Sequence, residues 1–482
     1  MTDQKPFRIV IVGGGLVGLT AAHILSKADI DFVILEKHES VTSTFGTTLA
    51  VWPQMFRIFD QLGLLQSLQP MLEQVDRSLI TVPQDARIRM VDRMPDYMNE
   101  NHGHPLKITH RPNLARFLYE SLPDSAKARI ATKKHVVGID VSEDGVKVAC
   151  DDGSIHEGSI VIGADGVRST IRQHVQANRL GKQLEDLSFD QKNPYVTTYR
   201  LYFGTVPNPP SSLEPNTRWD GASDGMCTQI IVGTNRIWYG VYEKLDSPTS
   251  EHRRYTEADK AEILRKWGDL YICPGWKVRD IDALRDSDAG LIDLEEGLVD
   301  TWFWKRIVLV GDAVRKMEPH AGLGYNCGVM DVVALTNALR QQLLRSNGGA
   351  PNTQEIETLF GRYQDDRAQE TRKGAELSEK GIRYLAWPTW KERAMSMYAL
   401  PYLPMTRLAA NNDLAPFISG TPVLEWLEEK ELPPSRKPWK HHPFQNKGLA
   451  DSRKSALGPS YTVFLLSSVV FAVTLGVYWR KS

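Results

Sequence analysis

The stretch RIVIVGGGLVGLTAAHILSKADIDFVILEK, residues 8–37, decides the fold of this chain. Its isoleucines and valines at 8–12 predict a buried strand, the apolar spacing over 15–28 predicts a helix, and FVILE at 32–36 predicts a second strand. Three glycines fall where the first strand passes into the helix, which is typical of a dinucleotide-binding turn. The sequence therefore predicts an α/β fold that begins with a nucleotide-binding βαβ unit.

Each glycine of this turn has its own physical role. Gly13 lets the chain turn tightly, Gly15 lets backbone N–H groups approach a pyrophosphate, and Gly18 lets the helix pack on the strand. Glu36 ends the second strand, where a carboxylate accepts hydrogen bonds from an adenosine ribose. Because that carboxylate would repel a 2′-phosphate, NADPH is a poor ligand for the turn, and NAD and FAD are the alternatives.

Composition narrows the class of protein. The chain has 482 residues, a formal net charge of -1 and 41% hydrophobic residues, so we expect a globular protein of two or three domains, or one large α/β unit, without a nucleic-acid partner. The four cysteines lie far apart and form no CxxC pair. We therefore expect free thiols in a reducing compartment, with no disulfide framework and no metal site.

Two further motifs follow buried strands. In VIGADGVRSTIR, residues 161–172, Asp165 belongs to a turn that is as readily an ordinary turn as a ligand contact. In VLVGDAVRKMEPHAGLGYNCGVMDVVAL, residues 308–335, Asp312 stands at a strand end, where a carboxylate can bind a polyol. Gly322 and Gly324 precede a helix whose N–H groups can hold a ring carbonyl.

These three motifs, in this order over about residues 7–345, resemble the flavoprotein monooxygenase superfamily of the p-hydroxybenzoate hydroxylase type. Within it the chain is similar to the fungal FAD-dependent epoxidases of indole-diterpene and meroterpenoid biosynthesis. HRPNLARFLYESL at 110–122, TTYRLYFGTV at 197–206 and NRIWYGVYEKL at 235–245 carry that similarity. The resemblance implies a discontinuous Rossmann-type FAD-binding domain with an inserted β-sheet substrate domain.

We accordingly expect six segments in the chain. They are the first part of the FAD-binding domain with interleaved substrate-domain strands (1–184), the main substrate domain (185–300), the second part of the FAD-binding domain (301–350), a helical region (351–435), a basic linker (436–460) and a transmembrane helix (461–479). The last segment has 19 uncharged residues with aromatic ends, although a buried C-terminal helix is the alternative. The basic linker predicts a tail anchor, in the endoplasmic reticulum, with a cytosolic catalytic domain.

The resemblance also assigns contacts with FAD. By position they are Gly13, Gly15, Gly18, Glu36, Ala50, Arg111, Asp165, Asp312, Gly322, Gly324 and Tyr325, with Asp165 where FAD and NADPH meet. Arg111 also makes chemical sense as a forked partner of the pyrophosphate, the alternative being a surface arginine. The chain departs from the family pattern at Ala50 (usually Gly), at Tyr325 (usually Ala) and at Arg315 (His in many relatives).

The implied activity is a monooxygenase reaction. NADPH reduces bound FAD, O2 adds to give a C4a-hydroperoxide, and one oxygen atom passes to the substrate. A lipophilic prenylated substrate suits a membrane anchor, and epoxidation of its prenyl alkene prepares it for a downstream terpene cyclase. Arg200 and Tyr239 are the candidate catalytic residues, but they and their strand neighbours Tyr199 and Trp238 fit a sheet-packing role equally well.

Three other functions remain open. An aromatic hydroxylase of the same fold would turn over phenolic acids and would have no clear use for the anchor. A flavin-dependent reductase would saturate prenyl alkenes without stoichiometric use of oxygen. A non-catalytic, membrane-tethered flavoprotein would bind FAD but show no substrate-stimulated oxidation of NADPH.

Overall fold

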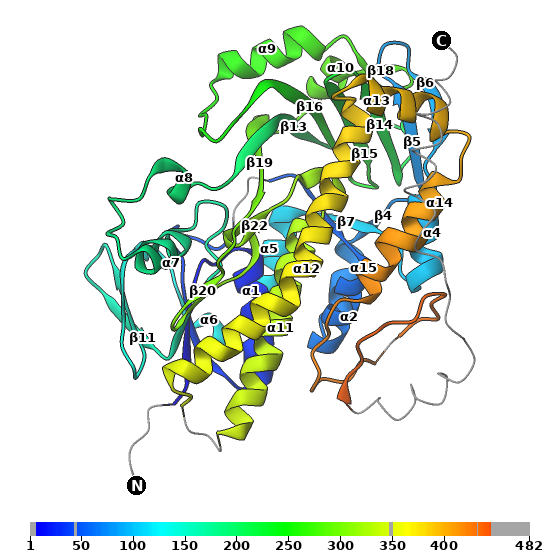
Figure 1. The fold of residues 1–482 in the computed structure, drawn as a ribbon. Coiled ribbons are helices and arrows are strands. Elements are labelled where there is room, and N and C mark those ends of the chain that lie inside the picture. Colours follow the sequence, from blue (N-terminus) through cyan, green and yellow to red (C-terminus); the bar gives the residue numbers. More distant parts are fainter. Residues whose placement is uncertain (1–5, 43–45, 347–349, 431, 445–482) are drawn as a thin grey trace, which may run out of the picture.

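Two sheets and two long helices organise the molecule in a computed structural model, which describes residues 6–42, 46–346, 350–430 and 432–444. A six-stranded sheet and an eight-stranded sheet lie at opposite ends of the fold (Figure 1). Helix α12 (Thr353–Ala386) runs past both, contacting the edge strand of the first sheet and three strands of the second. This helix therefore ties the two sheets into one body.

The six-stranded sheet contains the predicted βαβ unit. Strand β1 (Arg8–Val12) pairs in parallel with β2 (Asp31–Leu35), and α1 (Leu16–Ala28) connects them. The remaining strands are β12 (Ile160–Gly163), which is parallel to β1, and β21 (Ile307–Leu309), β20 (Phe303–Trp304) and β8 (Ile130–Ala131). The predicted α/β class, with a βαβ unit that starts at residue 8, is confirmed, and the sheet is parallel except for its edge strand β20.

The eight-stranded sheet is covered on both faces. Its strands, in order across the sheet, are β22 (Arg315–Lys316), β19 (Gly290–Leu298), β13 (Val196–Pro207), β16 (Arg236–Thr249), β15 (Met226–Val232), β14 (Thr217–Ser223), β5 (Arg77–Val82) and β6 (Arg87–Val91). One face, here called the outer face, packs on α9 (Glu257–Trp267) and α10 (Val278–Asp282). The other, the inner face, packs on the end of α12. Because both faces are buried, these strands lack the alternation of apolar and polar residues seen in half-exposed sheets.

The chain crosses between the two sheets several times. Strands β5 and β6 come from the first part of the chain, and β22 follows the strand and turn that end the six-stranded sheet. The pairing of Leu298 with Arg315 joins β19 to β22. Smaller sheets of three strands are formed by β9 (Val136–Val141), β10 (Val146–Cys150) and β11 (Ile155–Gly158), and by β3 (Thr48–Val51), β4 (Glu73–Gln74) and β7 (Lys107–His110).

The end of the described chain packs across two helices, α2 (Pro53–Leu62) and α4 (Met94–His102). Arg57 of α2 is 1% exposed and forms a buried ion pair with Glu429, with its Nε 2.5 Å from Oε1. The ring of Trp439 stacks under the same guanidinium at 4.4 Å. The predicted transmembrane stretch 461–479 lies outside the described residues, and no helix within them is long and apolar enough to cross a bilayer.

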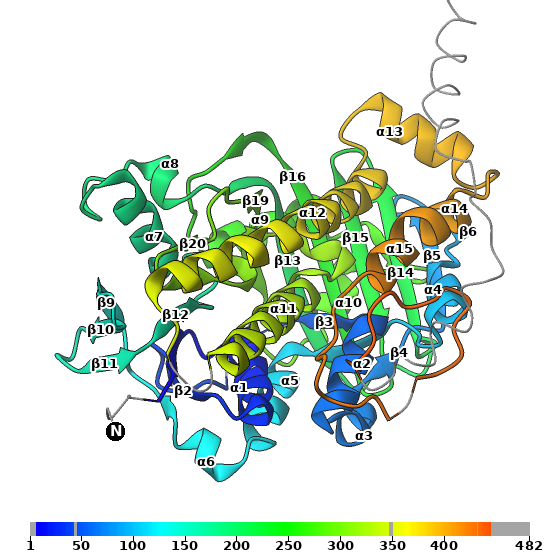
Figure 2. The same cartoon turned by 60° about the horizontal axis from the view of Figure 1, so that its bottom comes forward.

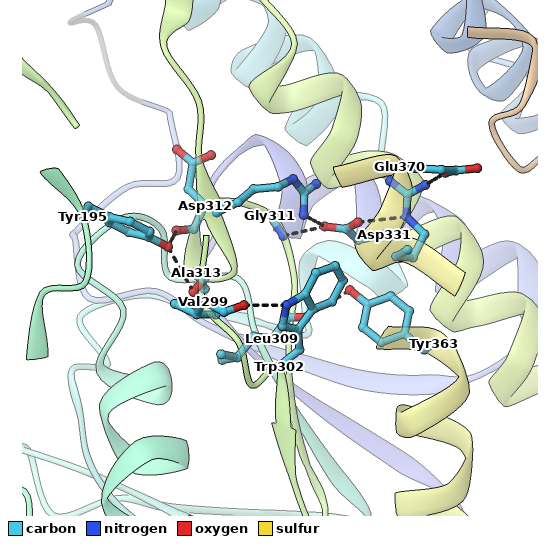
Figure 3. Close-up of polar contacts among 12 residues, drawn as sticks. Tyr195, Val299, Trp302, Leu309, Gly311, Asp312, Ala313, Asp331, Tyr363 and Glu370 are labelled. Carbon is cyan, nitrogen blue, oxygen red and sulfur yellow. Dashed lines mark hydrogen bonds and ion pairs between the residues drawn. The ribbon is translucent and has the colours of Figure 1, made fainter. Parts of the chain in front are cut away.

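A buried carboxylate joins the end of the six-stranded sheet to both long helices. Asp331 of α11 (Gly324–Arg345) accepts a hydrogen bond from the backbone N–H of Gly311, 3.0 Å away, as Figure 3 shows. Its Oδ2 lies 2.6 Å from Arg315 Nη1, and its Oδ1 lies 3.1 Å from Arg367 Nε of α12. Arg367 also pairs with Glu370. All three central side chains are almost fully buried, so the two guanidinium charges depend on this carboxylate.

Replacing Asp331 with Asn should therefore destabilise the protein strongly. The amide keeps the shape but removes the negative charge between two buried guanidinium groups, for which we expect a loss of about 3–5 kcal/mol in the free energy of unfolding. Urea unfolding followed by circular dichroism measures it. Asp269→Asn is the control, because Asp269 pairs with Arg279 at 2.8 Å on the surface and should cost about 1 kcal/mol or less. Equal losses in the two variants would contradict the role given to Asp331.

Candidate functional site

The glycine turn after β1 is shaped for a ligand at one point only. A Cβ on Gly13, whose φ is +109°, would lie 2.4 Å from the carbonyl oxygen of Ala164, and one on Gly18 would lie 2.0 Å from the oxygen of Gly13. Both glycines are therefore required by the packing of the protein itself. At Gly15 an added Cβ would meet nothing within 4 Å, so this side of the turn is open.

The start of α1 faces that open side. Gly15 caps the helix without a side-chain hydrogen bond, and the first turn carries no acidic residue. The first N–H groups of a helix have no partner within it and attract anions. The open side at Gly15 and the free helix start together fit the pyrophosphate of a dinucleotide, as the sequence predicts.

Glu36 holds the turn from the end of β2. Its Oε2 accepts a hydrogen bond from the N–H of Gly14 at 2.7 Å, and its Oε1 accepts one from His38 at 2.8 Å. The side chain is 8% exposed. A carboxylate has further lone pairs on both oxygens, so these two bonds leave it able to accept from a ribose hydroxyl.

Asp312 and the start of α11 lie next to each other. Asp312 belongs to the short 3-10 helix η2 (Gly311–Ala313) that follows β21, and its Oδ2 lies 2.6 Å from Lys316 Nζ. A Cβ on Gly324 would lie 3.8 Å from Asp312 Oδ1. In Figure 3 the hydroxyl of Tyr195 points at this turn, where it donates to the carbonyl oxygen of Asp312 at 3.0 Å. The predicted strand-end carboxylate and the glycine-rich helix start are therefore neighbours.

Asn326, in the first turn of α11, connects this helix to β3. Its Nδ2 donates to the carbonyl oxygens of Ala50 and Gly322 at 2.9 and 2.7 Å, and its Oδ1 accepts from the N–H of Trp52 at 3.0 Å. A Cβ on Gly322 would lie 2.4 Å from Cβ of Ala50. Because residue 50 carries a methyl group here, position 322 must be glycine, and the two predicted site residues are in direct contact.

Tyr325 and Arg111 lie apart from each other. Tyr325 is 8% exposed, and its hydroxyl lies 2.9 Å from Thr20 Oγ1 of α1, so it belongs to the packing between α1 and α11. Arg111 is exposed at the start of α5 (Arg111–Glu120), with its N–H donating to Thr47 at 3.0 Å. Arg111 is thus free to meet a phosphate, whereas the Tyr325 side chain is turned toward the helix interface. The roles of both in binding FAD remain predictions.

Asp165 caps a helix. Its Oδ1 accepts from Ser169 Oγ at 2.5 Å, and its Oδ2 accepts from the N–H of Ile171 at 3.1 Å, in the first turn of α7 (Thr170–Leu180). Its Cα would lie 2.9 Å from a Cβ on Gly13, so the two predicted residues adjoin. These bonds give Asp165 a structural reason to be there, which is the ordinary-turn alternative, and its contact with a cofactor remains a prediction.

The candidate catalytic residues Arg200 and Tyr239 lie on the outer face of the eight-stranded sheet. Arg200 pairs with Glu243, its Nη2 lying 2.6 Å from Oε2, and the hydroxyl of Tyr239 donates to Asp282 of α10 at 2.6 Å. That face is turned away from η2 and α11, toward α9 and α10. This arrangement does not test the predicted catalytic role of Arg200 and Tyr239. It makes their strand neighbours on the inner face, Tyr199 and Trp238, the better placed candidates for contact with a ligand.

Tyr199 lies on that inner face with its hydroxyl buried and unpartnered among the described residues. Trp238 also lies on that side of the sheet, where its Nε1 donates to His110 Nδ1 at 3.3 Å. Tyr199 is 1% exposed and is surrounded by apolar side chains. They include Leu201, Phe203, Ala222, Leu294, Ile382, Leu385 and Trp387. A buried hydroxyl without a partner is costly, so Tyr199 is a candidate contact for a polar group of a ligand.

A second unpartnered group comes from the turn before α11. His320 accepts a hydrogen bond at Nε2 from Arg218 Nη2, 2.9 Å away, and its ring meets Tyr242 edge-on at 5.2 Å. Burial lowers the pKa of His320 to about 4, so the ring is neutral. Because Nε2 accepts, the proton resides on Nδ1, which is buried and has no partner within the described chain. The Nδ1–H group is therefore available to donate a hydrogen bond to a ligand.

Glu318 completes this group of polar side chains. It is 2% exposed, its carboxyl accepts from the N–H of His320 at 2.9 Å, and its Oε1 has no partner among the described residues. Burial raises the pKa of Glu318 well above its usual range, which favours the protonated form of the carboxyl. Tyr199, His320 and Glu318 form the inner-face cluster, three hydrogen-bonding groups beside an apolar surface.

Comparison with known proteins identifies the family. The FAD binding domain family matches residues 7–369. The FAD-dependent monooxygenase srdH of Neurospora crassa is 33% identical over 412 residues, which cover 84% of this chain and 92% of that protein. The FAD-dependent monooxygenase dpchE of Colletotrichum higginsianum is 30% identical over 492 residues and covers 100% of both chains.

Solved structures agree on the fold. HpxO of Klebsiella pneumoniae, complexed with FAD and uric acid, superposes with a TM-score of 0.66 at 18% identity over 85% of this chain and 97% of that one. A salicylate hydroxylase in a substrate complex gives 0.64 at 19% identity, over 86% and 97% of the two chains. The predicted resemblance and the predicted FAD are confirmed. This chain belongs to the FAD binding domain family and is an FAD-dependent monooxygenase, which works with reduced nicotinamide nucleotide and O2.

Proposed function

We propose that this monooxygenase epoxidises an alkene in the prenyl chain of a meroterpenoid or indole-diterpene intermediate, with NADPH as the reductant. One atom of O2 becomes the epoxide oxygen, and the other leaves as water with two electrons from NADPH. The observation that carries the proposal is the inner-face cluster, in which Tyr199, His320 and Glu318 have buried polar atoms without partners among the described residues, beside apolar side chains of the sheet. Such a surface suits a hydrocarbon chain with a single polar head.

Bound FAD supplies the redox chemistry, namely electron transfer from the nicotinamide and activation of O2. The protein's own part is to bind and to exclude water. Gly15 and the start of α1 would hold the pyrophosphate, and Asp312 with the start of α11 would hold the flavin half. Apolar residues of the inner face keep water away from the reacting atoms.

The inner-face cluster would orient the substrate. The Nδ1–H of His320 is a donor, the Tyr199 hydroxyl can donate or accept, and the Glu318 carboxyl has an oxygen, Oε1, without a partner among the described residues. All three lie on residues next to the glycine turn of α11 or on the sheet that faces it. They can therefore fix a polar head group while the apolar chain lies along the sheet.

A membrane anchor supports the choice of substrate. We propose that residues 461–479 cross the membrane of the endoplasmic reticulum and leave the catalytic domain in the cytosol, because the stretch is uncharged and the basic linker precedes it. A prenylated aromatic compound partitions into the same bilayer. Its epoxide is an electrophile that a terpene cyclase can open by protonation, so a cyclase is the proposed consumer of the product.

Microsomes that carry the full chain test the reaction. We expect geranylgeranylated indoles or farnesylated phenolics to stimulate NADPH oxidation and oxygen uptake in equal amounts. The product should gain one oxygen atom and open in acid to a diol. Simple phenols as the best substrates would point to the hydroxylase, alkene saturation without oxygen uptake to the reductase, and FAD binding without stimulation to a non-catalytic flavoprotein.

Asp312→Ala should weaken the retention of FAD. The variant loses the carboxylate at the strand end, and its ratio of flavin to protein absorbance after gel filtration should fall several-fold, because a charge-assisted hydrogen bond of about 1.5–3 kcal/mol is lost. Asp124→Ala is the control, since Asp124 is a fully exposed surface carboxylate. An Asp312→Ala protein that purifies with full flavin content would refute the proposed contact.

Three tyrosine variants decide which face of the sheet binds the substrate. Tyr199→Phe should lower kcat/KM for the best prenylated substrate about threefold to tenfold, as expected for one lost hydrogen bond. Tyr202→Phe removes a hydroxyl from the same strand on the outer face, where it donates to Asp282 at 2.5 Å, and should leave kcat/KM unchanged. If Tyr239→Phe impairs turnover while Tyr199→Phe does not, the outer-face prediction is the better one.

A further inference from the structure

We propose that the segment from Trp390 to Leu408, here called the docking segment, rests in the interfacial layer of a lipid bilayer. It contains α13 (Trp390–Ala394), one π-helical turn (Met395–Ala399) and all but the last residue of α14 (Met405–Ala409). The docking segment lies within the described residues and is separate from the proposed anchor at 461–479.

The docking segment exposes several large apolar side chains. Trp390, Tyr398 and Tyr402 are 74%, 73% and 81% exposed, and Leu403 is 52% exposed. Met395 and Leu408 are exposed large apolar side chains of the same segment. Isolated exposed apolar residues are ordinary, but six within 19 consecutive residues form a patch of the kind that marks an interaction site.

The opposite side of the docking segment bonds to and packs against the rest of the protein. The carbonyl oxygen of Ser396, itself buried, accepts a hydrogen bond from Arg89 Nη2 at 2.6 Å. Met397 packs against the apolar inner face of the eight-stranded sheet. Arg393 reaches the turn between β14 and β15, where its Nη1 lies 2.9 Å from Asp224 Oδ2. The segment is thus amphipathic, with its aromatic side turned to the exterior.

The residue composition of the docking segment favours a lipid bilayer as its binding partner. Apart from Arg393, which pairs with Asp224, the docking segment has two basic residues, Lys391 and Arg407, and a single acidic one, Glu392. Trp, Tyr and basic side chains are the residues that prefer the membrane interface, and each basic residue adds about 1 kcal/mol on an anionic surface. The same chain carries the uncharged stretch 461–479, which supplies a second apolar contact with a membrane.

The docking segment lies close to the inner face of the eight-stranded sheet. Figures 1 and 2 both place α13, α14 and the edge strand β6 at one corner of the molecule, at the end of α12 that covers the eight-stranded sheet. Trp387, which ends α12, belongs to the inner face. A docked segment would therefore bring the inner face close to the lipid that holds the substrate.

A fluorescent probe at one position tests the proposal. All four native cysteines are buried, so a cysteine introduced at an exposed site can be labelled selectively. Full-chain Tyr402→Cys carries the environment-sensitive dye NBD, and the protein is reconstituted in nanodiscs of phosphatidylcholine and phosphatidylserine. We expect the dye emission to shift to the blue and to be quenched about twofold by doxyl-labelled lipids, as for a residue at interfacial depth.

Leu344→Cys is the matched control, because Leu344 is 63% exposed near the end of α11, away from the docking segment. Its emission should not respond to the quencher. Adding Tyr398→Asp to Tyr402→Cys should reduce the quenching. Absence of quenching at 402, or equal quenching at 402 and 344, would overturn the proposal. So would a blue shift without lipid that accompanies dimers in sedimentation, because it would indicate a second copy of the chain. None of these readouts requires turnover, so they stand apart from the proposed reaction.

Discussion

The fold depends on one buried carboxylate. Asp331 receives the N–H of Gly311 and two guanidinium groups, so a single side chain fixes the turn after β21, strand β22 and helices α11 and α12. Both elements that would hold the flavin half, η2 and the start of α11, are held at this point. Arg315 takes the place where many relatives have His, and here it serves the charge balance around Asp331. Its Nε and Nη2 have no partner within the described chain.

Local motifs made the first half of the site predictable. The glycine turn, Glu36 and the helix after it follow from contacts within about 30 residues, and close packing of backbone explains them. The packing at Gly13 involves Ala164, which lies in the second motif, so even this turn depends on a strand far along the chain. The α/β class and the long C-terminal helix were predictable for the same reason, because their apolar spacing is regular.

The face of a strand was not predictable where both faces are buried. Tyr199 and Arg200 are adjacent on β13, and alternation alone puts them on opposite sides without saying which side meets the flavin layer. The answer depends on α9, α10 and α12, three helices that pack from distant parts of the chain. Tyr325 and Asn326 show the same limit. These two residues are adjacent, yet the hydroxyl of Tyr325 lies against Thr20 while the amide of Asn326 bonds to Ala50. Only the orientation of α11 decides which side chain points which way.

Apolar surface continues from the interior of the enzyme to its exterior at Trp387. This residue is buried in the inner face, while the guanidinium groups of Arg89 and Arg393 stack on its ring at 5.6 and 5.9 Å. The docking segment begins three residues later with Trp390. A water-soluble substrate would gain nothing from such continuity, because exposed aromatic surface lowers solubility. The lipophilic substrate that we propose would favour such an arrangement, since each buried methylene group is worth about 0.8 kcal/mol. The place of Trp387 between the inner face and the docking segment is therefore consistent with the proposal that the substrate comes from a membrane.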